Sequence, residues 1–186
     1  MLIKNDEVKS FNRNFVITFA LIFVVLLGGS VSADEPVEIP LQDTKIIAGV
    51  NLATFEDTDF GYQVYAGAGV PIDDNLFVTG RYERYFAEDL GLNAITANFE
   101  YDLARIVTDE FELLRIYAQG NIGYYFGNFA DESISGPGIK GGMGAEVEIA
   151  GGFGASLNLN FRPLYFEDDD VDLTGLEAGL GAFFSF

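Results

Sequence analysis

The side chains best placed to do chemistry are charged residues that recur at alternate positions of the chain. From residue 44 onward polar and apolar residues alternate, and the polar positions carry five basic and five acidic side chains. These are Lys45, Arg81, Arg115, Lys140, Arg162, Glu83, Glu100, Glu146, Glu148 and Glu177. An enclosed space favours balanced charges, because an unpaired charge out of water costs several kcal/mol. The pattern therefore predicts a network of ion pairs on one enclosed face.

The composition excludes most catalytic uses of this network. The sequence contains no His and no Cys, so it has neither the commonest general base nor a thiolate or disulfide. Glu146 and Glu148 share one face of a strand, where paired carboxylates could act as general acid and base. Pairing with Lys45, Lys140 or Arg115 is the simpler role for them. We expect no enzyme activity, no catalytic residue and no cofactor.

The net charge sets this face apart from the rest of the chain. The sequence has 10 Lys and Arg residues against 29 Asp and Glu residues, which gives a net charge of −19 at pH 7. We expect no nucleic-acid partner, because phosphate binding needs a basic surface. Seven basic residues follow residue 33, and five of them lie on the polar face. A balanced face in so acidic a chain indicates an interior and not a solvated surface.

Acidic residues gather in one segment near the C-terminus, EDDDVD at positions 167–172. Its Asp168, Asp169, Asp170 and Asp172 are the candidate ligands for a metal ion such as Ca²⁺. The segment lacks the Gly and the bidentate Glu that an EF-hand loop needs at its sixth and twelfth positions. We expect a solvated loop there and no metal.

The N-terminal part has the pattern of an export signal. Basic residues precede an unbroken apolar run at 15–29, and Val31 and Ala33 match a small-residue cleavage site. We predict a cleaved signal peptide over residues 1–33 and a short periplasmic segment over residues 34–43. The alternative is an uncleaved membrane anchor, for which the apolar run falls short of the about 18 residues that span a bilayer.

Strands are the elements that position the charged residues. Alternation at every second residue, interrupted by clusters of Gly, Asp, Asn and Pro, predicts eight strands. They cover residues 44–55, 61–71, 75–86, 91–103, 113–126, 138–149, 153–165 and 174–186. Each is long enough to cross a bilayer at a tilt, which takes about 9–11 residues, whereas strands of globular proteins are most often about 5–6 residues long. Residues 104–112 could form a turn or a short helix.

The other face of these strands is apolar along their central positions, with residues such as Ile46, Ile95 and Leu159. Tyr and Phe lie toward the strand ends, as in the aromatic girdles of membrane barrels: Phe55, Tyr62, Tyr101, Phe126, Tyr165 and Phe186. Arg84 lies near one strand end, on the same face of the strand as the apolar residues, and could contact a lipopolysaccharide phosphate there. A soluble barrel with the two faces inverted would give the same alternation.

The export signal, the strand lengths and the balanced polar face favour a membrane barrel over a soluble one. We predict an all-β fold, an eight-stranded antiparallel up-and-down transmembrane β-barrel over residues 44–186. An even number of strands places both barrel termini on the same side, together with the connections 71–74, 104–112 and 150–152, and we predict that this side is periplasmic. The outer connections are then 56–60, 87–90, 127–137 and 166–173. Apart from 104–112, this fits the short periplasmic turns and longer outer loops of such barrels.

The strand number, the polar interior and the last strand, with Leu180, Ala182, Phe184 and Phe186 on its apolar side, carry a family resemblance. The chain resembles the small eight-stranded outer-membrane β-barrel family, which includes OmpX/Ail-like proteins and the transmembrane domain of OmpA. The resemblance implies that these four residues are an assembly signal read by the barrel-assembly machinery. It also implies that lipids and lipopolysaccharide are partners and that the protein is a monomer in the outer membrane of a Gram-negative bacterium.

These observations predict a small integral outer-membrane protein with a plugged polar interior and a structural or surface role without catalysis. The alternative is a surface-interaction protein, adhesin-like or ligand-binding, that acts through loops 127–137 and 166–173. We do not expect the protein to act as a diffusion porin, because eight strands enclose a space that side chains fill. Leakage of small ions through a narrow channel is a further alternative.

Overall fold

The structure is a computed structural model that describes residues 44–56, 60–106, 113–130, 132–166 and 171–186. The predicted signal peptide and periplasmic segment lie outside these residues, as do the aspartates at 168–170 and the side chain of Tyr165. Residues 107–112 lie outside them too, so the structure does not decide between a turn and a helix there. Among the described residues, no helix is long and apolar enough to cross a membrane.

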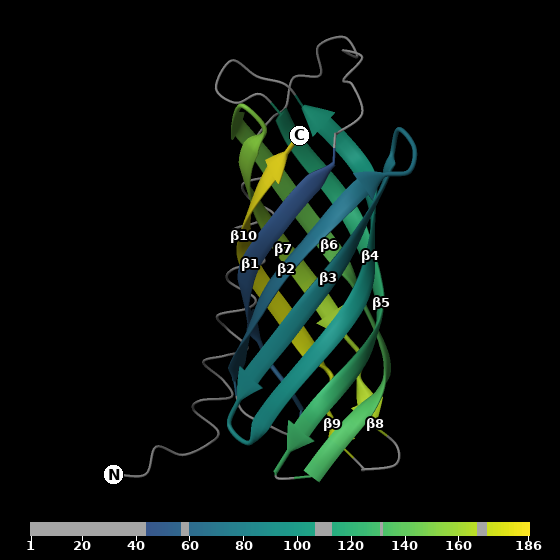
Figure 1. Ribbon diagram of the computed structural model, residues 1–186, viewed down its shortest axis with the longest axis vertical. Helices are drawn as coiled ribbons and strands as arrows, with labels where there is room; N and C mark the ends of the chain where they lie inside the picture. Colours follow the sequence, from purple (N-terminus) through teal and green to yellow (C-terminus); the bar gives the residue numbers. More distant parts are fainter. Residues whose placement is uncertain (1–43, 57–59, 107–112, 131, 167–170) are drawn as a thin grey trace, which may run out of the picture. The chain divides into compact units, whose positions relative to one another are not determined.

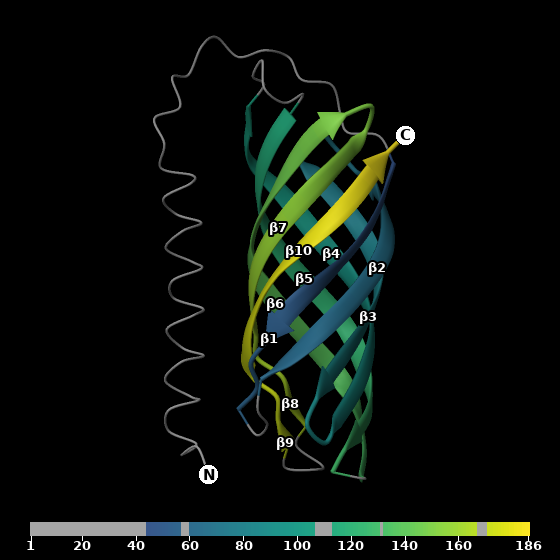
Figure 2. The ribbon, with the colours of Figure 1, turned by 90° about the vertical axis from the view of Figure 1, so that its left-hand side faces the viewer.

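Eight antiparallel strands close into a barrel in the order β1-β10-β7-β6-β5-β4-β3-β2 (Figure 1). They are β1 (Lys45–Ala53), β2 (Gly61–Pro71), β3 (Leu76–Ala87), β4 (Leu90–Ile106), β5 (Leu113–Phe129), β6 (Glu132–Ala150), β7 (Phe153–Arg162) and β10 (Gly175–Ser185). The last strand, β10, closes the barrel between β7 and β1, as Figure 2 shows. This confirms the predicted all-β, eight-stranded, antiparallel up-and-down barrel.

The two faces of the barrel wall differ in the way that the alternation predicts. Glu83 and Glu100 are fully buried inside the barrel, whereas Ile95 is 64% exposed and Leu180 is 60% exposed on its outer surface. The structure therefore excludes the inverted arrangement with apolar residues inside. An apolar outer surface is the arrangement that a lipid environment stabilises, since a closed barrel satisfies its backbone groups internally.

Interior glycines leave space for interior aromatic rings. A Cβ atom at Gly144 would collide with the Tyr117 ring, and one at Gly154 would collide with the Phe183 ring. Small and large residues thus face each other across neighbouring strands, Tyr117 on β5 opposite Gly144 on β6. Side chains fill the interior because each ring occupies the space that a side chain on the glycine of the neighbouring strand would otherwise take.

The barrel has two ends with different connections. We call one the terminal end, because it carries the start of β1, the end of β10 and the turns that join β2 to β3 and β6 to β7. The β6–β7 turn is formed by Gly151 and Gly152, whose φ angles of 59° and 81° favour glycine in a two-residue hairpin. The end of β4 and the start of β5 also lie at the terminal end. The opposite end, the loop end, carries the connections that join β1 to β2, β3 to β4, β5 to β6 and β7 to β10, the last with the small sheet of β8 (Tyr165–Phe166) and β9 (Val171–Asp172).

The prediction of a long outer loop over 127–137 is wrong. Residues up to Phe129 belong to β5 and residues from Glu132 belong to β6, and the two strands pair as far as Phe129 and Glu132. The glycines around Pro137 suggested a turn, but proline is tolerated in a strand with a free edge. The β6 residues before Gly141 have that free edge, because pairing with β7 begins at Gly141.

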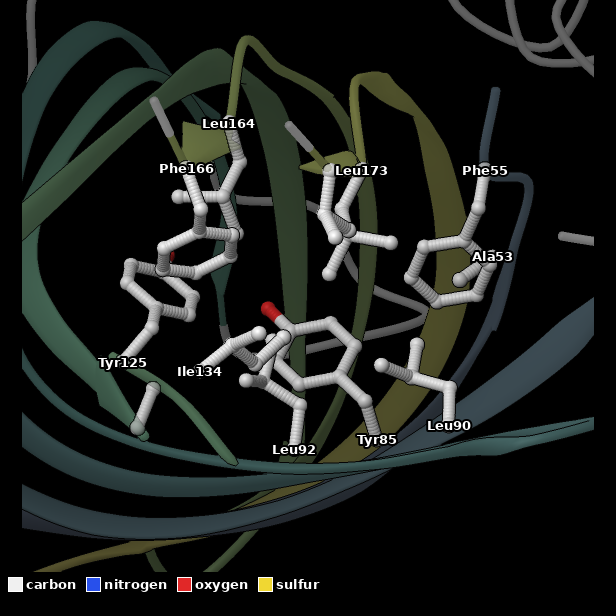
Figure 3. Close-up of a cluster of buried hydrophobic side chains, with 12 residues drawn as sticks. Ala53, Phe55, Tyr85, Leu90, Leu92, Tyr125, Ile134, Leu164, Phe166 and Leu173 are labelled. Carbon is white, nitrogen blue, oxygen red and sulfur yellow. The ribbon is translucent and has the colours of Figure 1, made fainter. Parts of the chain in front are cut away.

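An apolar cluster closes the barrel at the loop end (Figure 3). It consists of Ala53, Phe55, Tyr85, Leu90, Leu92, Ala94, Tyr125, Ile134, Leu164, Phe166, Val171 and Leu173. The segment 166–173 therefore does not form a wholly solvated loop, because its described apolar side chains are buried inside the barrel. The prediction that Phe55 belongs to an outer girdle is wrong for the same reason, since this ring packs inward, edge-on to Tyr85.

Candidate functional site

The charged side chains inside the barrel form two clusters, one nearer each end. The first, the terminal-end cluster, consists of Lys45, Arg81, Glu100, Asp102, Arg115 and Glu146. The second, the loop-end cluster, consists of Glu83, Lys140, Arg162 and Glu177. Each set contains equal numbers of basic and acidic residues; Arg105, which is partly exposed, pairs with Asp102 at the edge of the first cluster and is not counted in it.

Glu100 is the centre of the terminal-end cluster. Its carboxylate lies 2.9 Å from the Lys45 ammonium, 2.8 Å from the Arg81 guanidinium and 2.7 Å from the Arg115 guanidinium. The carboxylate also accepts a hydrogen bond of 2.9 Å from the side-chain amide of Asn98. Three cations around one fully buried carboxylate stabilise its ionised form, because each charge-assisted bond replaces lost hydration.

Two further carboxylates complete this cluster. Glu146 lies 2.7 Å from the Lys45 ammonium and 2.9 Å from the Arg115 guanidinium. The Nε of Arg115 donates a hydrogen bond to Asp102, which also pairs with Arg105 at the terminal end. The three cations of the cluster are therefore matched by three acids.

Aromatic rings line the terminal-end cluster. The Lys45 ammonium lies 4.3 Å from the centre of the Phe77 ring, and the Arg115 guanidinium lies 4.6 Å from the centre of the Tyr117 ring. Cations are attracted to ring faces most strongly where water is excluded. The rings therefore hold the cations in place while they fill the interior.

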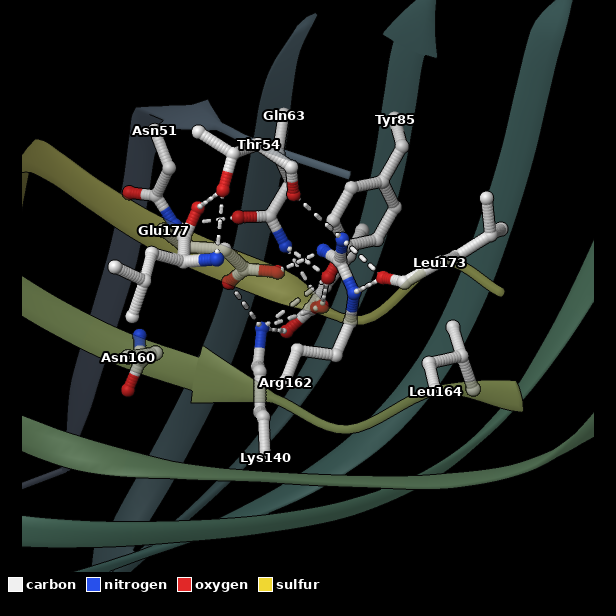
Figure 4. A network of polar contacts seen from close by, with 12 residues as sticks. Asn51, Thr54, Gln63, Tyr85, Lys140, Asn160, Arg162, Leu164, Leu173 and Glu177 are labelled. Atoms are coloured by element: carbon white, nitrogen blue, oxygen red, sulfur yellow. Dashed lines mark hydrogen bonds and ion pairs between the residues drawn. The ribbon is translucent and has the colours of Figure 1, made fainter. Parts of the chain in front are cut away.

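The loop-end cluster lies next to the apolar cluster and contacts it through Arg162 (Figure 4). Lys140 bridges two acids, with its ammonium 2.7 Å from Glu83 and 3.3 Å from Glu177. Arg162 pairs with Glu177 and donates a hydrogen bond of 2.9 Å to the carbonyl of Leu173. The guanidinium also lies 4.8 Å from the centre of the Tyr85 ring. One side chain thus joins an interior carboxylate to the segment that closes the loop end.

Uncharged side chains extend the loop-end cluster across the interior. The Gln63 amide donates hydrogen bonds of 2.7 Å to Glu83 and 2.9 Å to the Tyr85 hydroxyl, and Asn51 donates to Gln63 in turn. The Thr96 hydroxyl donates to the other oxygen of Glu83 over 3.1 Å. These bonds supply the donors that a buried carboxylate requires.

Nine of the ten charged residues predicted for the interior network lie in the two clusters, and Glu148 does not. Glu148 is half-buried at the terminal end, where it accepts a hydrogen bond of 3.1 Å from the backbone N–H of Gly152. Glu148 keeps the inward side of β6, opposite Leu113 on β5 and Gly154 on β7, but it lies at the end of the barrel, where a register shift between Glu148 and Ala150 leads into the turn.

Sequence reasoning missed Asp102, which takes the fifth acidic place inside the barrel. The signal was present, because Asp102 continues the alternation of Thr96, Asn98 and Glu100 along β4. The predicted strand ends at 103, and the predicted interior set stops at Glu100 on this strand. In fact β4 continues to Ile106, so Asp102 still faces Arg115.

The four residues of the predicted assembly signal lie on the outer surface. Leu180, Ala182 and Phe184 are exposed on β10, and Phe186 follows the strand and is 63% exposed. The rings of Phe184 and Phe186 are stacked with their centres 6.1 Å apart. Recognition of these residues by an assembly machinery stays a prediction.

The described residues contain no group of three acidic side chains that could hold a metal ion. Of the four aspartates predicted as candidate ligands, Asp172 lies within the described part, where it accepts a hydrogen bond of 2.8 Å from the Thr174 backbone N–H. This contact is that of a turn and offers no support for a cation site.

The closed barrel with an apolar outer surface defines the class: the fold is that of the small eight-stranded outer-membrane β-barrels. The crystal structure of Neisserial surface protein A (NspA) is similar, with a TM-score of 0.57 and 14% identity over 77% of this chain and 96% of that chain. The predicted resemblance is thereby confirmed for the fold. No protein-family model and no curated protein matches the sequence.

Two further structures show some similarity to this chain. One comes from work on the de novo design of transmembrane β-barrels, with a TM-score of 0.51 and 12% identity over 80% of this chain and 100% of that chain. The other is the Yersinia pestis outer membrane protein Ail in a phospholipid nanodisc, with a TM-score of 0.47 and 13% identity over 78% of this chain and 99% of that chain. At such identities the likeness concerns the fold alone.

Proposed function

We propose that the protein is a small integral outer-membrane β-barrel with a plugged interior, whose role is structural or at the cell surface and requires no catalysis. One observation carries the proposal: two neutral ion-pair clusters lie inside an apolar outer wall. Charged residues inside and apolar residues outside suit a lipid environment and no other. The predicted signal peptide over 1–33 supports export through the inner membrane.

The interior contacts argue against a pore or a narrow ion-leak channel. The loop-end cluster and the apolar cluster lie one after the other along the barrel and are joined by Arg162. A permeating ion would have to separate buried ion pairs and then cross closely packed apolar side chains. Both steps are unfavourable, because each removes a charge from its partners into a medium of low polarity.

No observation favours the alternative of a surface-interaction protein that acts through 127–137 and 166–173. Most of the first segment is paired strand, and the described apolar side chains of the second segment are buried. The second segment therefore contributes to closing the barrel, whereas the exposed side chains of the first, such as Asn128, Glu132 and Ser133, belong to a paired hairpin and not to a separate loop.

The proposal is tested by refolding the chain without residues 1–33 into phospholipid vesicles and planar bilayers. We expect the refolded protein to migrate on SDS gels at a different apparent mass before and after boiling. We also expect a conductance no higher than that of protein-free bilayers. A steady conductance from the heat-modifiable form would contradict the plugged interior. Loss of heat-modifiable migration would contradict the membrane barrel itself.

The matched control is Phe166→Ala, which removes the ring of one residue from the apolar cluster and leaves every described ion pair in place. We expect this variant to remain folded and nonconducting, because the two ion-pair clusters still fill the barrel. Brief current steps from Phe166→Ala, and none from the wild-type chain, would show that the apolar cluster alone seals the barrel.

A further inference from the structure

Arg84 differs from every other basic residue of the barrel. After residue 43 the chain has seven basic residues, and six of them form ion pairs within the described structure: Lys45, Arg81, Arg105, Arg115, Lys140 and Arg162. Arg84 is exposed on the outer surface of β3 and pairs with no carboxylate of the described residues. The one described cation on the apolar outer wall therefore lacks an anionic partner among the described residues.

The strands beside Arg84 supply no negative charge. Its cross-strand neighbours are Val64 on β2 and Asn93 on β4. The Asn93 side chain already accepts a hydrogen bond of 2.7 Å from the Tyr82 hydroxyl and donates one of 3.3 Å to the Phe126 carbonyl. A neutral amide with both ends engaged does not compensate a guanidinium.

Aromatic rings direct the Arg84 side chain toward the loop end. Its guanidinium lies 5.0 Å from the centre of the Phe86 ring, which is two residues nearer the loop end on the same strand. Phe86 in turn stacks on Tyr62, with ring centres 4.8 Å apart. Aromatic residues on the outer wall, such as the exposed Tyr62 and the half-buried Phe86, lie at the boundary between lipid tails and headgroups, and a long basic side chain reaches outward to the same boundary.

We propose that Arg84 binds the phosphate of a lipid headgroup in the leaflet at the loop end of the barrel. A guanidinium matches phosphate oxygens with a planar pair of donors, and it is attracted to anionic headgroups at the membrane surface. The ring of Phe86 holds the guanidinium, so little freedom is lost when the phosphate binds. The inference rests on the proposed function, since it requires that the barrel spans a membrane.

The test is native mass spectrometry of the refolded barrel in detergent micelles, titrated with phosphatidylglycerol or phosphatidylcholine of the same chain length. Wild-type and Arg84→Gln are compared after both are shown to be heat-modifiable on gels. We expect the variant to bind the first phosphatidylglycerol about fivefold more weakly, as for one basic residue at a membrane surface, with phosphatidylcholine binding little changed. Arg84→Lys keeps the charge and should retain part of the affinity.

The matched control is Tyr82→Phe, which breaks the neighbouring hydrogen bond to Asn93 and leaves the charge in place. We expect it to bind phosphatidylglycerol as the wild-type chain does. Equal affinity of wild-type and Arg84→Gln for phosphatidylglycerol would overturn the inference, as would an equal loss of both lipids. An arm with sodium phosphate, at an ionic strength matched by sodium chloride, distinguishes free phosphate from lipid: abolition of phosphatidylglycerol binding by phosphate alone would also overturn it.

The two proposals fail in different ways. A chain that shows no heat-modifiable form refutes the proposed membrane barrel, and the lipid titration is then not reached. A folded barrel in which Arg84→Gln makes no difference refutes only the lipid site.

Discussion

The two ion-pair clusters inside the barrel solve the same electrostatic problem in different ways. In the terminal-end cluster three cations surround Glu100, with ion-pair distances between 2.7 and 2.9 Å. In the loop-end cluster no acid contacts more than two cations, and Lys140 bridges Glu83 and Glu177 at 2.7 and 3.3 Å. The first cluster is therefore organised around one acid, whereas the second is a chain of pairs.

The surroundings of the clusters differ as well. The Lys45 and Arg115 side chains of the terminal-end cluster lie against aromatic rings of the barrel wall. The loop-end cluster lies against the apolar cluster and is attached to it by Arg162. Burial of charge is tolerated at both places because each cluster is neutral and hydrogen-bonded. The comparison teaches that the cost of losing one charge depends on how many partners that charge serves.

The largest effect is expected at the centre of the terminal-end cluster. Glu100→Gln leaves three cations with two carboxylates inside the barrel, so we expect the free energy of unfolding to fall by about 3–5 kcal/mol. Urea titration of the refolded barrel in detergent micelles, followed by the gel shift, measures this loss. Adding Lys45→Met to Glu100→Gln restores the balance of charge and should recover part of the stability. A double variant no more stable than Glu100→Gln would contradict charge balance as the cause.

A smaller effect is expected in the loop-end cluster. Glu177→Gln removes the partner of Arg162 and one of the two partners of Lys140, which keeps Glu83. The same titration should show a loss of about 2–3 kcal/mol. Glu148→Gln is the control, because its described hydrogen bond is to a turn, and it should cost less than about 1 kcal/mol. The contrast between the clusters fails if Glu177→Gln costs as much as Glu100→Gln.

The smallest effect is expected in the coupling between the clusters. No ion pair joins them among the described residues, so the double variant of Glu100→Gln and Glu177→Gln should lose the sum of the two single losses to within about 0.5 kcal/mol. A double-mutant cycle on the four proteins measures the difference. A coupling well above that value would mean that the two clusters act as one network.

Much of the fold could be predicted from the alternation of residue types. Glu83 and Glu100 face inward and Ile95 and Leu180 face outward because side chains alternate across a strand whatever its register. The boundaries were less certain, since Gly136, Pro137 and Gly138 suggest a turn when read locally. Their place in β6 depends on hydrogen bonds to β5, which a single strand does not reveal.

Pairing within the candidate site could not be predicted from the same pattern. Alternation along a strand identifies the residues that face the interior. The register between strands decides which of these residues meet, and it places Arg115 on β5 near Asp102 and Glu100 on β4. The exchange of Glu148 for Asp102 has the same origin. Glu148 lies where β6 turns at the barrel end, whereas Asp102 lies within β4, which pairs with β5 as far as Ile106.

The sequence by itself determined the class of structure, because the period of two, the strand lengths and the balance of charge on one face are properties of composition and spacing. The tertiary structure alone decided that the interior divides into two neutral clusters and that Phe55, Leu164, Phe166 and Leu173 turn inward to close one end. The reason is physical. Alternation is local to a strand, whereas contact across a barrel depends on closure, which brings residues far apart in the chain together.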